Sequence, residues 1–104
     1  MTFETSRIIP ADHPSLAGHF PGVPIVPGVV VLEEVAAALA EWRQDSQITG
    51  IPSVKFTAPI KPGQSFVIGF DSRNIAENQI DFCCRLDGRV VVEGRLEISC
   101  GASI

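Results

Sequence analysis

The hydrophobic pattern predicts a short strand, one helix and four longer strands, in that order. From Gly28 to Arg43 the chain is rich in Val, Leu, Ala and Glu and contains no helix breaker, which is typical of a helix. The short strand, Glu4–Ile9, ends at Pro10 because proline removes a donor from any ladder. The later strands are rich in β-branched and aromatic residues and are separated by turn residues: Ile48–Ile60, Ser65–Arg73, Gln79–Leu86 and Arg89–Ser99.

Turn residues and alternation indicate that the strands form one antiparallel sheet. Asp87-Gly88 separates the last two strands, and both residue types accept the positive φ of a primed hairpin turn. Lys61–Gln64 marks another turn. The last strand alternates between apolar residues (Val90, Val92, Leu96 and Ile98) and charged residues (Glu93, Arg95 and Glu97). One sheet face is therefore apolar, and the helix is its cover, which predicts a single α+β domain over residues 1–104.

Composition and charge narrow the range of partners. The chain is 45% hydrophobic and 19% charged, typical of a folded protein that is apolar enough to self-associate. Its 8 basic and 12 acidic residues give a net charge of −4, which argues against nucleic acid or an anionic membrane as the main partner. No stretch approaches ~18 uninterrupted apolar residues, and the N-terminus lacks a signal-peptide pattern. We expect neither secretion nor membrane insertion.

The three cysteines, Cys83, Cys84 and Cys100, form neither an even set nor a metal-binding spacing. Adjacent strand residues point to opposite faces, so a bridge between Cys83 and Cys84 is not expected. A reducing cytoplasm fits this pattern best. The residues His13, His19 and Glu33 lack a close-spaced ligand motif, so we expect no metal site.

The segment from Pro10 to Pro27 contains five prolines and two glycines, too many for a regular element. It holds His19 in a stretch with little backbone freedom, fourteen residues before Glu33. A neutral imidazole, with an ordinary pKa near ~6.5, accepts a proton at cellular pH. A turn histidine can also serve only local backbone groups. Rigid placement favours His19 as a catalytic base, whereas His13 lies outside the most constrained part.

The predicted helix carries two adjacent acids in different settings. Glu33 shares its face with small or apolar residues: Val29, Val30, Ala36, Ala37 and Ala40. Glu34 shares a stripe with Glu41, so we expect Glu34 to be solvated and Glu33 to be buried. Burial raises the pKa of a carboxyl group, as a general acid requires; the alternative is a glutamate at the helix margin that reaches water. Gly28, at the helix start, is expected to expose a backbone N–H that polarises a carbonyl, unless it serves only the turn.

These motifs resemble those of the FabA/FabZ-type 3-hydroxyacyl-[acyl-carrier-protein] dehydratases. The resemblance rests on the acid Glu33 and on three segments: Gly18–Gly22, Pro24–Val29 and Val54–Gly63. Val23 stands where many such enzymes have a second histidine, and the chain is short. It therefore looks like the compact stand-alone dehydratases of aryl-polyene or other polyketide-like pathways.

The resemblance implies a hotdog fold, in which a curved antiparallel sheet wraps one long central helix and two protomers pair their sheets. It also implies catalysis at the dimer interface without a cofactor. His19 would take the α-proton, Glu33 of the partner subunit would protonate the leaving C3 hydroxyl, and the Gly28 N–H would bind the thioester oxygen. The product would be a trans-2-enoyl thioester.

The resemblance also implies a substrate and partners. The acyl chain would contact a set of apolar residues around the helix start: Phe20, Pro27, Val29, Phe56 and Ile60. An acidic acyl carrier protein would meet a basic patch drawn from Arg7, Lys55, Lys61, Arg85, Arg89 and Arg95. We expect a homodimer, with larger assemblies left open. Two alternatives remain: a hotdog acyl thioesterase, and a non-catalytic acyl- or carrier-binding subunit of a hotdog heterodimer.

Overall fold

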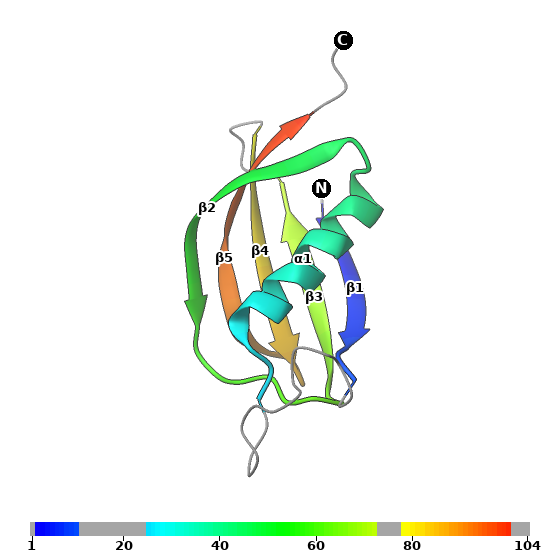
Figure 1. The fold of residues 1–104 in the computed structure, drawn as a ribbon, viewed down its shortest axis with the longest axis vertical. Coiled ribbons are helices and arrows are strands. Elements are labelled where there is room, and N and C mark those ends of the chain that lie inside the picture. Colours follow the sequence, from blue (N-terminus) through cyan, green and yellow to red (C-terminus); the bar gives the residue numbers. More distant parts are fainter. Residues whose placement is uncertain (1, 11–24, 73–77, 101–104) are drawn as a thin grey trace.

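The computed structural model describes residues 2–10, 25–72 and 78–100, which form one helix packed on a five-stranded antiparallel sheet (Figure 1). The elements are β1 (Thr2–Ile8), α1 (Gly28–Trp42), β2 (Ser46–Phe56), β3 (Ser65–Asp71), β4 (Gln79–Leu86) and β5 (Arg89–Cys100). The strands lie in the order β1-β3-β4-β5-β2, so β1 and β2 are the two edges. The predicted α+β architecture, one helix covering one antiparallel sheet, is confirmed.

Helix α1 is held by its apolar side chains. Its buried residues are Val30, Val31, Val35, Ala38 and Leu39. They pack against the inner face of the sheet, whose buried residues include Phe66, Ile68, Phe70, Ile80, Phe82 and Leu96. Full burial of one such aliphatic or aromatic side chain contributes about 1.5–3 kcal/mol. Within the described part of the chain, no helix is long and apolar enough to cross a membrane.

Three aromatic rings fix the C-terminal end of α1 to the sheet. The ring of Trp42 stacks on Phe3 of β1 and on Phe70 of β3, with centroid distances of 5.7 and 5.6 Å. The Arg43 guanidinium lies over the Trp42 ring, 4.7 Å from its centroid. Because these contacts join β1, the end of α1 and β3, they connect parts of the chain that are distant in sequence.

Both predicted turns are present, and their glycines have the backbone angles that the turns require. Asp87 and Gly88 have φ of 50° and 80°, as a primed hairpin turn demands. Gly63 has φ of 83°, and its N–H donates to the Ile9 carbonyl at 2.8 Å. This bond ties the segment after β2 to the end of β1.

The predicted inward position of Val90 is wrong because β5 contains a bulge. Cys84 pairs with Val92 and Arg85 with Val90, so Val91 is an extra residue between the two pairs. Val91 is 4% exposed, whereas Val90 is 44% exposed. The alternation in the sequence therefore holds only from Val92 onward.

The cysteines on β4 point to opposite faces, as expected. Cys84 is fully buried on the inner face, and Cys83 is half-buried on the outer face; both are free thiols. Burial raises the pKa of the Cys84 thiol to about 12, and the neighbouring Cys83 adds to this shift.

The raised pKa of Cys84 predicts a loss of stability in alkaline solution. In the unfolded chain this thiol ionises near its ordinary pKa of 9.0, but in the folded state it keeps its proton up to about 12. Its contribution is therefore complete below pH 9 and is lost as the pH rises toward 12. Between pH 7 and 10.5 we expect the free energy of unfolding to fall by about 2 kcal/mol more in the native chain than in Cys84→Ala.

Urea unfolding at both pH values measures this difference. Cys84→Ala keeps the other titrating groups, so it is the matched reference, although its cavity makes it less stable at pH 7. Parallel pH dependence of the two proteins would contradict the prediction.

Candidate functional site

A pocket of about 360 Å³ lies where α1 begins. One wall is the segment 56–60 that follows β2, and the opposite wall is formed by Gly28 and Val31 of α1 with Ile25 and Val26 before them. Val92 of β5 also lines it. The lining side chains are mostly aliphatic or aromatic, and none carries a charge. Such a pocket suits an apolar group with a polar end at the helix start.

Backbone hydrogen bonds hold the pocket walls in place. The Val26 N–H donates to the Ile60 carbonyl at 2.8 Å, which joins the two walls directly. The Thr57 N–H donates to the Val91 carbonyl at 2.8 Å, and its hydroxyl donates to the same carbonyl at 3.2 Å. These bonds fix the segment after β2 against the bulged start of β5, so the pocket is built before any ligand arrives.

Gly28 places a backbone donor at this pocket. The Pro27 carbonyl accepts the N–H groups of Val30 and Val31 at 3.0 and 3.3 Å, which starts the helix. The Gly28 N–H has no acceptor among the described residues, as expected of a donor at the first helical position. It lies at the positive end of the helix dipole, where a developing negative charge is stabilised. The Phe56 ring lies close to Gly28, so that a Cβ there would be 3.0 Å from Phe56 Cζ.

The predicted burial of Glu33 is wrong for the single chain, in which Glu33 is exposed. The helix is apolar on most sides, so spacing alone does not choose which side faces the sheet. The larger Val and Leu side chains face the core because they bury more area. The face with Glu33 is left outside, together with Val29, which is 63% exposed, and the exposed Ala36, Ala37 and Ala40.

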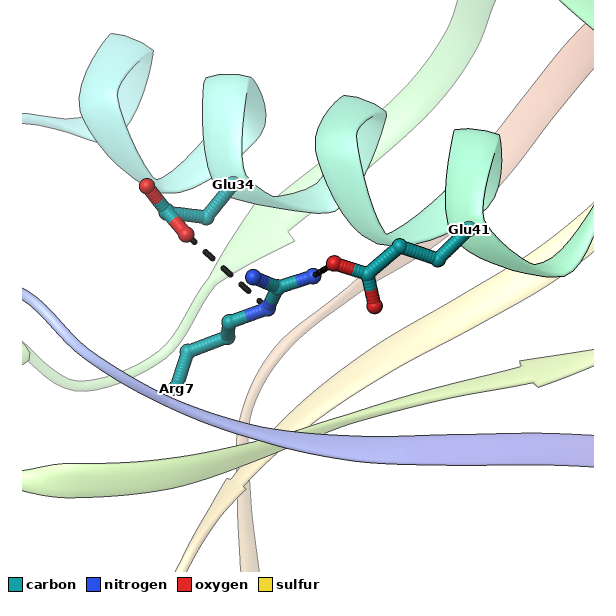
Figure 2. A network of polar contacts seen from close by, with 3 residues as sticks. All are labelled: Arg7, Glu34 and Glu41. Atoms are coloured by element: carbon teal, nitrogen blue, oxygen red, sulfur yellow. Dashed lines mark hydrogen bonds and ion pairs between the residues drawn. The ribbon is translucent and has the colours of Figure 1, made fainter. Parts of the chain in front are cut away.

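The predicted solvation of Glu34 is also wrong. Glu34 is half-buried and faces Arg7 of β1, with 4.0 Å between Glu34 Oε1 and Arg7 Nε (Figure 2). The Arg7 Nη2 donates to Glu41 Oε2 at 2.5 Å. The two adjacent acids therefore have opposite settings from those predicted: Glu34 joins the helix to a strand, and Glu33 is exposed.

The structure brings together only some of the predicted site residues. Gly28, Phe56 and Ile60 line the pocket, but Pro27 and Val29 do not. His13, His19 and Phe20 lie outside the described residues. Seven lining residues were not predicted: Ile25, Val26, Val31, Thr57, Ala58, Pro59 and Val92. The motif around Pro27 could have indicated the first two, whereas Val92 reaches the pocket only through strand pairing.

Of the six residues from which a basic patch was expected, three are in ion pairs. Arg7 pairs with acids of α1, Arg85 with Glu4 at 2.5 Å, and Arg95 with Asp81 at 2.9 Å. The other three have no ion pair with a described residue: Lys55, Lys61 and Arg89. Residues 2–10, 25–72 and 78–100 contain no group of three His, Cys, Asp or Glu side chains suited to a metal ion. The predicted absence of metal stays a prediction, because both histidines lie outside these ranges.

Comparison with known proteins relates this geometry to one enzyme family. A family model named ApeI-like and described as ApeI dehydratase matches residues 1–95. The 3-hydroxyacyl-[acyl-carrier-protein] dehydratase FabZ of Roseiflexus castenholzii is 32% identical over 100 residues, which cover 86% of this chain and 70% of that protein. FabZ of Nitratidesulfovibrio vulgaris is 32% identical over 95 residues, with 82% and 59% covered. FabZ of Chlamydia trachomatis is 44% identical over 62 residues, with 50% and 40% covered. The chain thus spans less than two thirds of the length of two of these relatives.

Solved structures confirm the predicted hotdog fold. The dehydratase heterocomplex ApeI:P from Xenorhabdus doucetiae superposes with a TM-score of 0.76 at 22% identity, covering 93% of this chain and 86% of that chain. The (R)-hydratase from A. caviae involved in PHA biosynthesis gives 0.73 at 16%, covering 95% and 93%. A 1,4-dihydroxy-2-naphthoyl-CoA thioesterase from Synechocystis gives 0.72 at 14%, covering 96% and 82%. Because hydratases and thioesterases share this fold, the fold alone does not distinguish the two reactions.

The close approach of Phe56 to Gly28 predicts that these two residues are energetically coupled. In Gly28→Ala, the new Cβ forces the Phe56 ring to move, which cancels the gain that alanine brings to a helix. In a Phe56→Ala background the same change stabilises the protein. We expect a coupling free energy of about 1 kcal/mol in a double-mutant cycle measured by urea unfolding. Additive effects would show that the ring does not lie against Gly28.

Proposed function

The chain belongs to the ApeI-like family of dehydratases, and on that premise we propose that it removes water from a 3-hydroxyacyl thioester to give a trans-2-enoyl thioester. The observation that carries this proposal is the placement of Gly28 and Glu33 on α1. The Gly28 N–H lies at an apolar pocket, and Glu33 is exposed on a face of small and apolar residues. A donor for a carbonyl and an acid for a leaving hydroxyl are two of the three groups that dehydration needs.

The third group is the base, for which we propose His19. Its imidazole takes the proton from the carbon next to the thioester carbonyl, and the carbonyl oxygen gains negative charge. The Gly28 N–H donates a hydrogen bond to that oxygen. As the double bond forms, the bond from C3 to the hydroxyl breaks and Glu33 gives its proton to the departing oxygen, which leaves as water. The thioester itself acidifies the α-proton, so the scheme uses no cofactor.

We propose that the acid comes from a partner subunit, because of the angle between Gly28 and Glu33. Glu33 comes five positions after Gly28 in the helix, which places their directions roughly 140° apart around the helix axis. The pocket at Gly28 and the carboxylate of Glu33 in the same chain therefore point to different sides. A second protomer whose Glu33 meets this pocket completes the site.

Two further features support a dimer. Strand β2 is an edge of the sheet, and its exposed residues include three large apolar ones: Ile51, Val54 and Phe56. Unpaired backbone groups along an edge strand accept another strand. The uncovered helix face around Glu33 is also apolar except for that carboxylate. Pairing of two copies covers both surfaces. The site residues Phe20, Pro27 and Val29 would then contact substrate within the dimer.

Mutation of the proposed base and acid tests the reaction. We expect His19→Ala and Glu33→Gln each to slow dehydration of a 3-hydroxyacyl thioester by at least ~10²-fold, because each removes one proton transfer, while both proteins stay folded. The enoyl thioester and free thiol are measured together by mass spectrometry. Thiol release without enoyl product would indicate a thioesterase instead, and turnover of neither kind by the native protein would indicate a binding subunit.

Mixing the two variants tests the shared site. Half of the randomly exchanged dimers then contain one of each subunit, and each such dimer has one intact site out of two. We therefore expect about a quarter of the native activity to return. No recovery after subunit exchange has been verified would contradict the shared site and leave the reaction itself unaffected.

We also propose that an acyl carrier protein delivers the substrate at the pocket. Lys61 follows the lining residue Ile60, and Arg89 precedes Val90, whose carbonyl accepts the Thr57 hydroxyl at 3.3 Å. Both basic residues are exposed and next to the pocket wall. They suit an acidic carrier, whereas the basic residues in ion pairs are already neutralised.

A cytoplasmic location, expected from the cysteines, stays a prediction.

Charge reversal tests this docking surface. We expect Lys61→Glu with Arg89→Glu to raise KM about tenfold for the carrier-bound substrate and to leave KM unchanged for the same acyl group on N-acetylcysteamine. Arg95→Glu, which changes the charge on the outer sheet face, is the matched control. Equal effects on both substrates would place these residues in the pocket rather than in carrier binding.

A further inference from the structure

We propose that Arg7 is a positioning residue, which sets the rotation of α1 and thereby the direction in which Glu33 points. The inference rests on the proposed function, because it takes Glu33 to be the catalytic acid. Arg7 lies on β1, far from the pocket in sequence, and touches neither the pocket nor Glu33. Its effect on the reaction would pass through the helix.

The contacts of Arg7 span two turns of the helix. Its Nη2 donates to Glu41 at 2.5 Å, and its Nε lies 4.0 Å from Glu34 (Figure 2). These acids are seven residues apart, so they lie on nearly the same line along the helix. One guanidinium therefore holds one stripe of α1 toward the edge of the sheet. Rotation of the helix in either direction moves both carboxylates away from it.

Apolar packing fixes the rotation of α1 less strictly than the two contacts of Arg7 do. The buried residues of α1 are Val, Ala and Leu, and hydrophobic attraction is not directional. The stacked ring of Trp42 holds only the C-terminal end of the helix, nine residues after Glu33. Glu33 precedes Glu34, so any rotation is passed on directly to its carboxylate. At roughly 6 Å from the helix axis, a rotation of about 20° moves that carboxylate by about 2 Å. Misplacement of a catalytic group by this amount greatly slows a reaction that depends on alignment.

The ion pairs of Arg7 with Glu34 and Glu41 contribute little to the stability of the fold. Its members are partly exposed, with side-chain exposures of 21% for Arg7, 28% for Glu34 and 51% for Glu41. Exposed ion pairs contribute little to stability. In addition, Arg7 Nε is buried and has no hydrogen-bond partner among the described residues, since Glu34 is too distant to accept from it. An arrangement that leaves a buried donor unsatisfied and still joins two turns of the helix is better explained by alignment than by stability.

Substitution of Arg7 separates alignment from stability. Arg7→Met keeps the length and apolar stem of the side chain but removes every donor. We expect kcat with an N-acetylcysteamine thioester to fall tenfold or more, KM to stay within twofold, and Tm to shift by less than about 5 °C. Arg7→Lys, which reaches one carboxylate at a time, should recover part of kcat. Glu41→Gln removes the same ion pair from the other side and should also lower kcat. It provides the test if Arg7→Met does not fold.

Arg85→Met is the matched control. Arg85 also pairs with a carboxylate at 2.5 Å, but this pair with Glu4 joins two strands and does not touch the helix. Its kcat should equal that of the native protein. Native kcat in Arg7→Met, or an equal loss in Arg85→Met, would overturn the proposal.

A readout independent of activity distinguishes this proposal from the proposed function. Amide NMR shifts of Val29, Glu33 and Ala36 should change in Arg7→Met and not in Arg85→Met, because they report the setting of α1 whatever the protein catalyses. If these shifts change but the native protein does not dehydrate the thioester, the alignment role survives and the proposed reaction fails. Unchanged shifts would overturn the alignment role alone.

Discussion

The packing of α1 on the sheet is the constraint on which the rest of the structure depends. The helix buries its larger aliphatic side chains, such as Val31 and Leu39, because these remove the most apolar area from water. That choice leaves the smaller residues and Glu33 outside and turns Glu34 toward β1. The same orientation brings Gly28 to the pocket beside Phe56. The rotation of α1 on the sheet therefore determines where Gly28, Glu33 and the Arg7 ion pairs lie.

Sequence patterns predicted the elements well wherever the signal was local. The predicted helix Gly28–Arg43 differs from α1 by one residue, and the hairpin at Asp87-Gly88 has the backbone angles that its residue types favour. The fold class followed from these local signals, because one helix and an antiparallel sheet with one apolar face have few ways to pack. The strand predicted over 48–60 ends earlier, at Phe56, where the chain turns to form the pocket wall.

The failures arose where long-range contacts decide. Nothing local distinguishes the two faces of a helix made of Val, Leu and Ala, so the settings of Glu33 and Glu34 were exchanged. The bulge at Val91 depends on the pairing of β4 with β5 and reversed the predicted direction of Val90. Arg7 and Glu41 are thirty-four residues apart, and only the folded chain shows that they form an ion pair. The role of His19 rests on the proline-rich sequence around it and on the family resemblance, since that residue lies outside the described ranges.

In the proposed mechanism the single chain holds only part of the site, because the acid comes from a partner subunit. A hydratase and a thioesterase both have this fold, so the fold does not distinguish the two reactions. In this chain Glu33 is exposed on α1 and lies roughly 140° around the helix axis from Gly28, which lines the pocket. For the proposed dehydration, the active site is therefore the interface between two subunits. The residue that the second subunit has at the position of Glu33 then determines whether the site contains an acid.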